Sequence, residues 1–271
     1  MKLQNILTAL LFSMGLTSCM TNMYQVYEVQ SPNLVQKENS MVFENEDCKL
    51  LYNLWCENGS MQFIFENKTN SDLFVDMNQT FFIKNGAAYN YYNNRTYQTQ
   101  TFTSLDYGYS TSSTYWSKGS FWPTQYDLKT ISEKSKTRVG ISTGISTKEA
   151  ELICIPAKSF KVFNYYTINP EFIKTCDKKI DYPKKQSTVE TYNEHNTPLT
   201  FKNRISYSFN KTGESLQQIE NTFWLAMVKN YSRKAAIEEV KEKKGCSDFE
   251  TNVFYFKIGG PNQFYKEYKA F

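Results

Sequence analysis

Residues 140–144 have the order G-x-S-x-G, with Ser142 at the centre. In α/β-hydrolases this order places a nucleophilic serine on a strained turn between a buried strand and a helix. Here the polar run KSKTR precedes the motif, and the residues after it repeat GIST instead of opening a helix. The base would have to be His195, the only histidine, with Asp177 or Asp181 as the acid. A serine hydrolase is therefore the weakest function class considered, and we predict no catalytic residues.

Acidic residues that could bind a metal ion lie close together in two places: Glu44, Glu46 and Asp47, and then Glu149 and Glu151. The first cluster lacks the D-x-[DN]-x-[DN]-G order of an EF-hand loop, so a solvated turn is the better interpretation. Neither cluster indicates the cleft across which glycosidases hold two carboxylates. One histidine is too few for a histidine-based metal site. We predict no metal ion and no cofactor, and we expect His195 on an exposed turn.

The segment 87–147 is rich in Tyr, Trp, Asn, Gln, Ser and Thr, and lacks strong periodicity. Tyrosine among small polar residues is typical of binding loops, because flat amphipathic rings provide contact area at low entropic cost. The alternative is that these rings are buried and hold a long insertion to the body of the protein. As candidate ligand-binding residues we single out Tyr91, Tyr92, Trp116 and Trp122.

The first residues have the order of an export signal: Lys2, then an apolar stretch that ends near Leu16, then small residues. The stretch is shorter than the roughly 20 residues that a membrane-spanning helix needs. Leu16-Thr17-Ser18-Cys19 closely resembles the lipobox of bacterial lipoproteins, in which the leader is cut before the cysteine. We therefore expect a signal peptide at 1–18.

The lipobox resemblance implies a diacylglyceryl group on Cys19, and usually a third acyl chain on the new amino terminus. Two or more chains make membrane attachment stable. Met20 follows the cysteine instead of aspartate, which in many Gram-negative lipoproteins looks like release to the outer membrane. We expect a lipid-anchored protein of the cell envelope, and the alternative is an ordinary secretory leader with a chance cysteine.

The formal net charge of +4 is close to balanced for 271 residues and indicates no nucleic-acid partner. Setting Cys19 aside leaves an odd number of cysteines: Cys48, Cys56, Cys154, Cys176 and Cys246. An oxidising envelope permits disulfides, but at least one of these thiols cannot pair within the chain. The chain contains no C-x-x-C motif, which argues against a zinc ribbon or a thioredoxin-like redox site.

Alternation with a period of two dominates the rest of the chain, as in KLLYNLWC (49–56) and MQFIFEN (61–67). Asn58-Gly59 and Asn85-Gly86 are hairpin signals, because both residue types tolerate positive φ. Many short strands separated by turns predict a mainly β fold, with a β-sandwich the best architecture. Residues 61–86 also resemble the paired-strand core of immunoglobulin-like domains in bacterial lipoproteins, which implies an immunoglobulin-like sandwich.

One helix is expected at 232–244, because Ser232 can cap it and RKAAIEEVKEKK contains good helix formers. We divide the mature chain into a polar tether at 19–38, a β-sandwich at 39–185 that contains the insertion, and a β-rich extension at 186–271 packed on the sandwich.

Three function classes follow. The first is a non-catalytic module that binds or assembles with another cell-envelope protein. The second is a glycan-binding protein that uses the aromatic insertion, and the third is the hydrolase.

Overall fold

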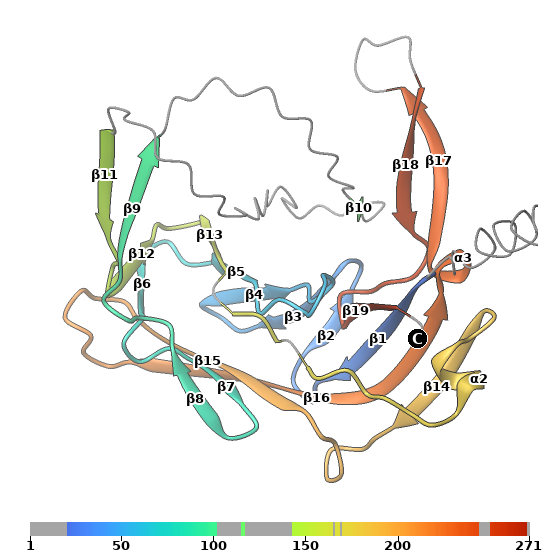
Figure 1. Ribbon diagram of the computed structural model, residues 1–271. Helices are drawn as coiled ribbons and strands as arrows, with labels where there is room; N and C mark the ends of the chain where they lie inside the picture. Colours follow the sequence, from blue (N-terminus) through green and yellow to red (C-terminus); the bar gives the residue numbers. More distant parts are fainter. Residues whose placement is uncertain are drawn as a thin grey trace, which may run out of the picture.

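The computed structural model confirms a mainly β protein (Figure 1). Two antiparallel sheets pack face to face, which is consistent with the predicted β-sandwich. The residues that the structure describes are 21–101, 115–116, 143–164, 166–168, 170–243 and 250–269.

The larger sheet has nine strands and curves beneath the smaller one. Its main path runs β12 (Leu152–Ile155), β6 (Leu73–Asp76), β15 (Thr200–Ser208), β16 (Gln217–Ser232), β1 (Asn22–Gln30) and β19 (Gln263–Lys269). Three further strands join this path: β7 (Phe81–Lys84) pairs with β15, β8 (Ala87–Asn90) with β7, and β14 (Gln186–Thr191) with β16.

The smaller sheet has five strands in the order β13 (Phe160–Phe163), β5 (Phe63–Asn67), β4 (Cys48–Tyr52), β3 (Ser40–Glu44) and β2 (Val35–Lys37). The alternation read from the sequence is confirmed in β4 and β5, where Leu50, Tyr52, Phe63 and Phe65 are all fully buried. One continuous apolar core joins these residues to Phe201 and other side chains of the larger sheet. The two sheets therefore share a single core.

A chain of hydrogen bonds crosses this core between the two sheets. Tyr52 of the smaller sheet donates through its hydroxyl to Asn221 Oδ1 at 2.7 Å and accepts from Asn203 Nδ2 at 3.1 Å. The hydroxyl of Tyr91 donates to Asn203 Oδ1 at 2.9 Å. Buried polar groups cost free energy unless they are paired, so this network fixes how the sheets face each other.

Both Asn-Gly signals mark turns of positive φ. Asn85 (φ 47°) and Gly86 (φ 84°) form the two-residue connection between β7 and β8. Asn58 (φ 62°) and Gly59 (φ 70°) lie within a longer loop between β4 and β5. The hairpin pairing predicted for 49–67 is thus confirmed, although its connection is longer than a tight turn.

The predicted polar tether at 19–38 is wrong. Residues 22–30 form β1, an inner strand of the larger sheet that pairs with β16 on one side and β19 on the other. Tyr24, Val26, Tyr27 and Val29 of this strand are buried. The strand shows no simple alternation, because its four consecutive residues 24–27 are all buried. One of them, Gln25, is polar and is hydrogen-bonded to Asn230.

The predicted helix at 232–244 is also wrong. Ser232 does cap a helix, since its hydroxyl accepts from the amide of Ala235, but α3 covers only Arg233–Ala236. The chain continues as β17 (Ile237–Lys243), paired with β18 (Glu250–Phe256). This pairing buries Ile237 and Val253, and tertiary contacts of this kind override helix propensity. The only other helix among the described residues is α2 (Lys178–Asp181).

The predicted division at 185/186 does not separate a sandwich from an extension. Strands β15 and β16, from the second part, lie in the middle of the larger sheet, and β15 pairs directly with β6 and β7 from the first part. Residues 186–271 therefore complete the sandwich instead of packing on it.

Two hairpin-like arms rise from the same side of the body (Figure 1). One pairs β9 (Thr96–Thr101) with β11 (Thr143–Lys148), and the other pairs β17 with β18. Between β9 and β11, the short strand β10 (Tyr115–Trp116) pairs in parallel with β18. The long insertion thus begins at one arm and reaches the other. No helix among the described residues is long and apolar enough to cross a lipid bilayer.

Candidate functional site

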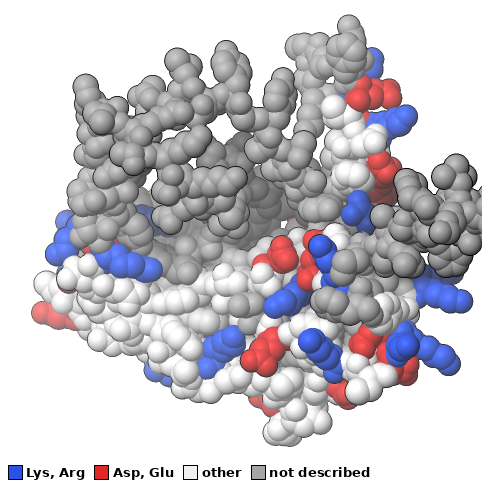
Figure 2. Space-filling view, in the orientation of Figure 1, with Lys and Arg blue, Asp and Glu red and all other residues white. Residues whose placement is uncertain are grey.

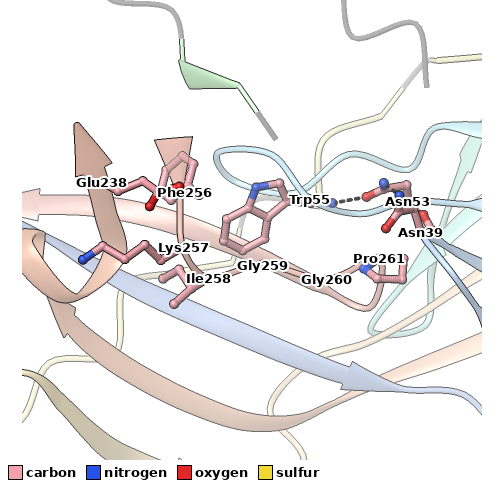
Figure 3. Close-up of a pocket in the computed structure, with 10 residues that line it drawn as sticks. All are labelled: Asn39, Asn53, Trp55, Glu238, Phe256, Lys257, Ile258, Gly259, Gly260 and Pro261. Carbon is pink, nitrogen blue, oxygen red and sulfur yellow. Dashed lines mark hydrogen bonds between the residues drawn. The ribbon is translucent and has the colours of Figure 1, made fainter. Parts of the chain in front are cut away.

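A pocket of about 440 Å³ lies where the β17–β18 arm joins the sandwich (Figure 3). We call it the Trp55 pocket. It is formed by the loop after β4, the first part of β17 and the connection from β18 to β19. Its lining residues are Asn39, Asn53, Trp55, Glu238, Phe256, Lys257, Ile258, Gly259, Gly260 and Pro261.

Local hydrogen bonds hold Trp55 in place. The side chain of Asn53 accepts from the amide of Trp55 at 3.0 Å and donates to the carbonyl of Asn39 at 3.2 Å. The next amide back, that of Leu54, donates to the carbonyl of Pro261 at 2.9 Å. Hydrogen bonds therefore link the loop that carries the indole both to the residue before β3 and to the turn that precedes β19.

Gly259 packs its backbone against the indole ring. Its φ of +125° is a conformation that L side chains rarely adopt, and a Cβ there would lie 2.6 Å from Cε2 of Trp55. Only glycine permits such a close approach of backbone to ring. The glycine is thus part of the pocket's construction.

Aromatic contacts join the pocket to the base of the arm. The ring of Phe256 meets Trp55 edge to face, with centroids 5.2 Å apart, and also packs against Tyr265 at 4.6 Å and Tyr24 at 5.5 Å. Aromatic pairs in this geometry add to the free energy of apolar burial. The indole is fixed in orientation, yet the residue as a whole remains half-buried.

Some polar groups of the pocket form no hydrogen bond or ion pair with other described residues. Among the described residues, no acceptor bonds to the indole N–H of Trp55, and no cation pairs with the carboxylate of Glu238. Lys257 extends away from Trp55 in Figure 3, and its ammonium group donates to the carbonyl of Lys234 at 2.7 Å. The pocket therefore offers an aromatic surface, an N–H donor and a carboxylate.

The residues predicted from the sequence do not gather at this pocket. Tyr91 is fully buried and bonded to Asn203, so its assignment as a ligand-binding residue is wrong and packing explains it. Tyr92 is partly exposed and donates to Glu151 at 2.9 Å, at the base of the other arm. The backbone of Trp116 lies in β10.

Other sequence predictions fall on residues outside the described ranges: Cys19, Trp122 and Ser142. His195 is on an exposed turn, as expected. In the part of the chain that the structure describes, no three His, Cys, Asp or Glu side chains come together as a metal site. Asp47 instead accepts from the hydroxyl of Tyr207, and Glu44 pairs with Lys68 at 2.8 Å.

The described cysteines are free thiols in two environments. Burial raises the pKa of Cys48 to about 12 and that of Cys56 to about 12, with the neighbouring carboxylates Asp47 and Glu57 adding to the effect. Cys154 and Cys176 are exposed. A raised pKa keeps a thiol protonated and unreactive at neutral pH.

Sequence reasoning missed Trp55 because it was read as one more residue of a strand. The available signal was its position just before the Asn58-Gly59 turn, in a loop and not in a paired strand. The second signal, Gly259-Gly260-Pro261, marks a backbone bend that needs positive φ. Nothing in the sequence connects these two segments, which lie about two hundred residues apart.

Comparisons of the chain with protein-family models, with curated proteins and with solved structures found no match. The fold and the Trp55 pocket are therefore the basis of the function proposed below.

Proposed function

We propose that this chain is a lipid-anchored protein of the bacterial cell envelope, held by Cys19, and that it acts as a non-catalytic module that binds another envelope protein. The Trp55 pocket is the recognition site. Its ligand is a lysine or arginine side chain of the partner.

The observation that carries this proposal is the pairing of an indole with an unpaired carboxylate in one pocket. Trp55 and Glu238 both line it, and the carboxylate of Glu238 forms no ion pair among the described residues. A cation over the face of a tryptophan, beside a carboxylate, gains from both groups. The ammonium group of Lys257 does not compete with the ligand for Glu238, because it donates to the backbone carbonyl of Lys234.

The binding step can be tested with small probes. We expect N-acetyl-arginine amide to change the tryptophan fluorescence of the protein, and the neutral isostere N-acetyl-citrulline amide to have much less effect. Glu238→Gln should raise the Kd for the arginine probe about fivefold, because an exposed ion pair contributes about 1 kcal/mol to binding. Glu190→Gln, an exposed carboxylate in β14 outside the pocket, is the matched control.

Equal binding of the two probes would contradict cation recognition. Saturable binding of an oligosaccharide that is lost in Trp55→Ala and kept in Trp224→Ala would favour the glycan-binding alternative. Circular dichroism of each variant checks that the fold is intact.

The partner can be sought in intact cells. A photo-crosslinking residue at position 238 should give a discrete adduct with one envelope protein, and the same residue at position 190 should not. Substitution of the contacting Lys or Arg of the captured protein by Gln should abolish the adduct. No discrete adduct at 238 under several growth conditions would count against a protein partner.

A further inference from the structure

The distance between the predicted lipid anchor and the folded body is short. Cys19 precedes the first residue of β1, Asn22, by three positions, and three extended residues span at most about 11 Å. Since β1 is an inner strand of the larger sheet, the lipid chains would attach to the sandwich itself and not to a flexible tether. The end of the body where β1 begins must then face the bilayer.

Cations surround this end of the molecule. Lys269 pairs with Asn22 across the sheet. Ser232 pairs with Met23, and the hydroxyl of Ser232 donates to the carbonyl of Lys184. We call the following six residues the basic end: Lys184, Lys185, Arg233, Lys234, Lys257 and Lys269.

A surface hollow joins two of these cations to the chain entry. It is lined by Arg233 and Lys234 of α3, together with Thr21, the first described residue. Lys257 reaches the same helix, where its ammonium donates to the carbonyl of Lys234. The cations therefore lie around the point at which the anchor joins the body.

Elsewhere on the protein, some cations form ion pairs, whereas others in the described part of the chain, such as Lys161 and Lys211, form none. Glu220 pairs with both Lys202 and Arg204 at 2.7 Å, and similar pairs form in β1, β4 and the turn after β5. Within the described ranges, none of the six cations of the basic end forms an ion pair. Arg233 instead stacks over the ring of Phe254 at 5.2 Å.

Acidic residues at this end are fewer than the six cations, and some of them already interact with other groups of the protein. They are Asp181, Glu239, Glu267, Glu57, which is close enough to Glu267 to raise its pKa, and Glu238, which lines the Trp55 pocket together with Lys257. Asp181 accepts from the hydroxyl of Thr175 at 2.7 Å, and burial raises the pKa of Glu267. Figure 2 shows blue side chains at this right-hand end, with red ones interspersed. The balance of six cations against five carboxylates is positive by one charge.

We infer that the basic end lies against the membrane and binds the anionic headgroups of the bilayer in which Cys19 is anchored. The inference rests on the proposed lipid attachment at Cys19. An 11 Å connection is comparable to the Debye length of about 8 Å at physiological salt, so the cations feel the surface potential of the headgroups. The contact orients the sandwich on the bilayer and sets the position of the Trp55 pocket relative to it, since Lys257 belongs to the basic end and also lines that pocket.

The test uses the full lipidated protein, purified from cells and reconstituted in vesicles of neutral phosphatidylcholine or with about 30 mol % phosphatidylglycerol. A membrane-impermeant acetylating reagent modifies exposed lysines, and mass spectrometry gives each rate. We expect Lys184, Lys185 and Lys234 to be acetylated at least about threefold more slowly in the anionic vesicles at low salt, with recovery at high salt. Lys161 and Lys211, exposed at the opposite end, should be unaffected.

A charge variant sharpens the result. Lys184→Gln with Lys185→Gln should reduce the protection of Lys234, whereas Lys161→Gln with Lys211→Gln should not. Equal rates for Lys184, Lys185 and Lys234 in both vesicle types would overturn the inference. Failure of the anchor itself gives a different result: the amino-terminal peptide would carry no lipid mass, and the protein would not float with neutral vesicles.

Discussion

The two arms are fastened to the same sandwich by different forces. At the β9–β11 arm, the carboxylate of Glu149 accepts from the amides of Asn93 and Arg95 and from the Arg95 guanidinium at 2.8 Å. At the β17–β18 arm, Phe256 packs among Trp55, Tyr24 and Tyr265. One attachment depends on a charge and the other on apolar contact.

This difference has a functional meaning for the pocket. Apolar and aromatic burial is insensitive to pH and salt, so the arm that forms the Trp55 pocket keeps its position across conditions. The charged attachment weakens when its carboxylate is protonated. We therefore expect the two arms to respond independently, and the following predictions are ordered by the size of the expected effect.

Gly259→Ala should have the largest effect. The new methyl group would collide with the Trp55 ring, and the backbone conformation would be strained, so we expect a loss of about 2–4 kcal/mol in the free energy of unfolding. Gly213→Ala is the matched control: its φ is +71°, but a Cβ there meets nothing within 4 Å. Chemical denaturation of both variants separates the collision from the strain. A loss no larger than that of Gly213→Ala would show that the indole moves freely.

Phe256→Ala should come next. Removing a partly buried ring that contacts three other rings should cost about 2–3 kcal/mol. It should also reduce amide-exchange protection in β17 and β18 while leaving β9 and β11 unchanged. Phe209→Ala, an exposed ring, should cost less than about 0.5 kcal/mol. Equal loss of protection in both arms would mean that they open together.

Glu149→Gln should destabilise the other arm more modestly. Its carboxylate is nearly buried, but Arg95 is 41% exposed, which reduces the strength of the pair; we expect a loss of about 1–2 kcal/mol. The matched control is Glu151→Gln, since that exposed carboxylate accepts one bond from Tyr92. Denaturation and amide exchange should show the loss in β9 and β11 for Glu149→Gln alone.

The smallest effect is a pH response of the same arm. Burial raises the pKa of Glu149, but the hydrogen bonds from Arg95 and Asn93 outweigh it, and the net pKa lies below the usual value. The stabilisation is thus complete above about pH 4.3, the pKa of an unfolded glutamate, and is lost as the pH falls through the lower folded value. Protection factors in β9 and β11 should decline in that range, and those in β17 and β18 should change less. Glu149→Gln should remove the difference.

The sequence was most informative where structure is local. The alternation in 49–56 and 61–67 predicted strands whose inward residues are now buried, and Asn85-Gly86 predicted a hairpin of two residues. It was least informative for β1 and β17. NMYQVYEVQ looks polar because four of its nine residues are Asn, Gln or Glu, although Gln25 is buried and hydrogen-bonded to Asn230. IEEVKEK looks helical because its charged residues are good helix formers.

The residues of the candidate site were also difficult to predict from local sequence patterns. Tyr91 belongs to a segment whose composition indicated binding, yet its ring is in the core. Trp55 attracted no attention in the sequence, and it forms the centre of the pocket only because Gly259 returns to it from the far end of the chain.

By itself, the sequence determined the mainly β class, several hairpins and the expectation of a lipid on Cys19, because alternation, turn chemistry and leaders are encoded in neighbouring residues. The tertiary structure decided that β1 is an inner strand next to that cysteine, that residues 237–243 pair as a strand, and that Trp55 and Glu238 share a pocket. The first and third of these features depend on contacts between residues more than 150 positions apart, which local patterns cannot specify. The second depends on pairing with β18, at most 19 positions away, which overrides the helix propensity of residues 237–243.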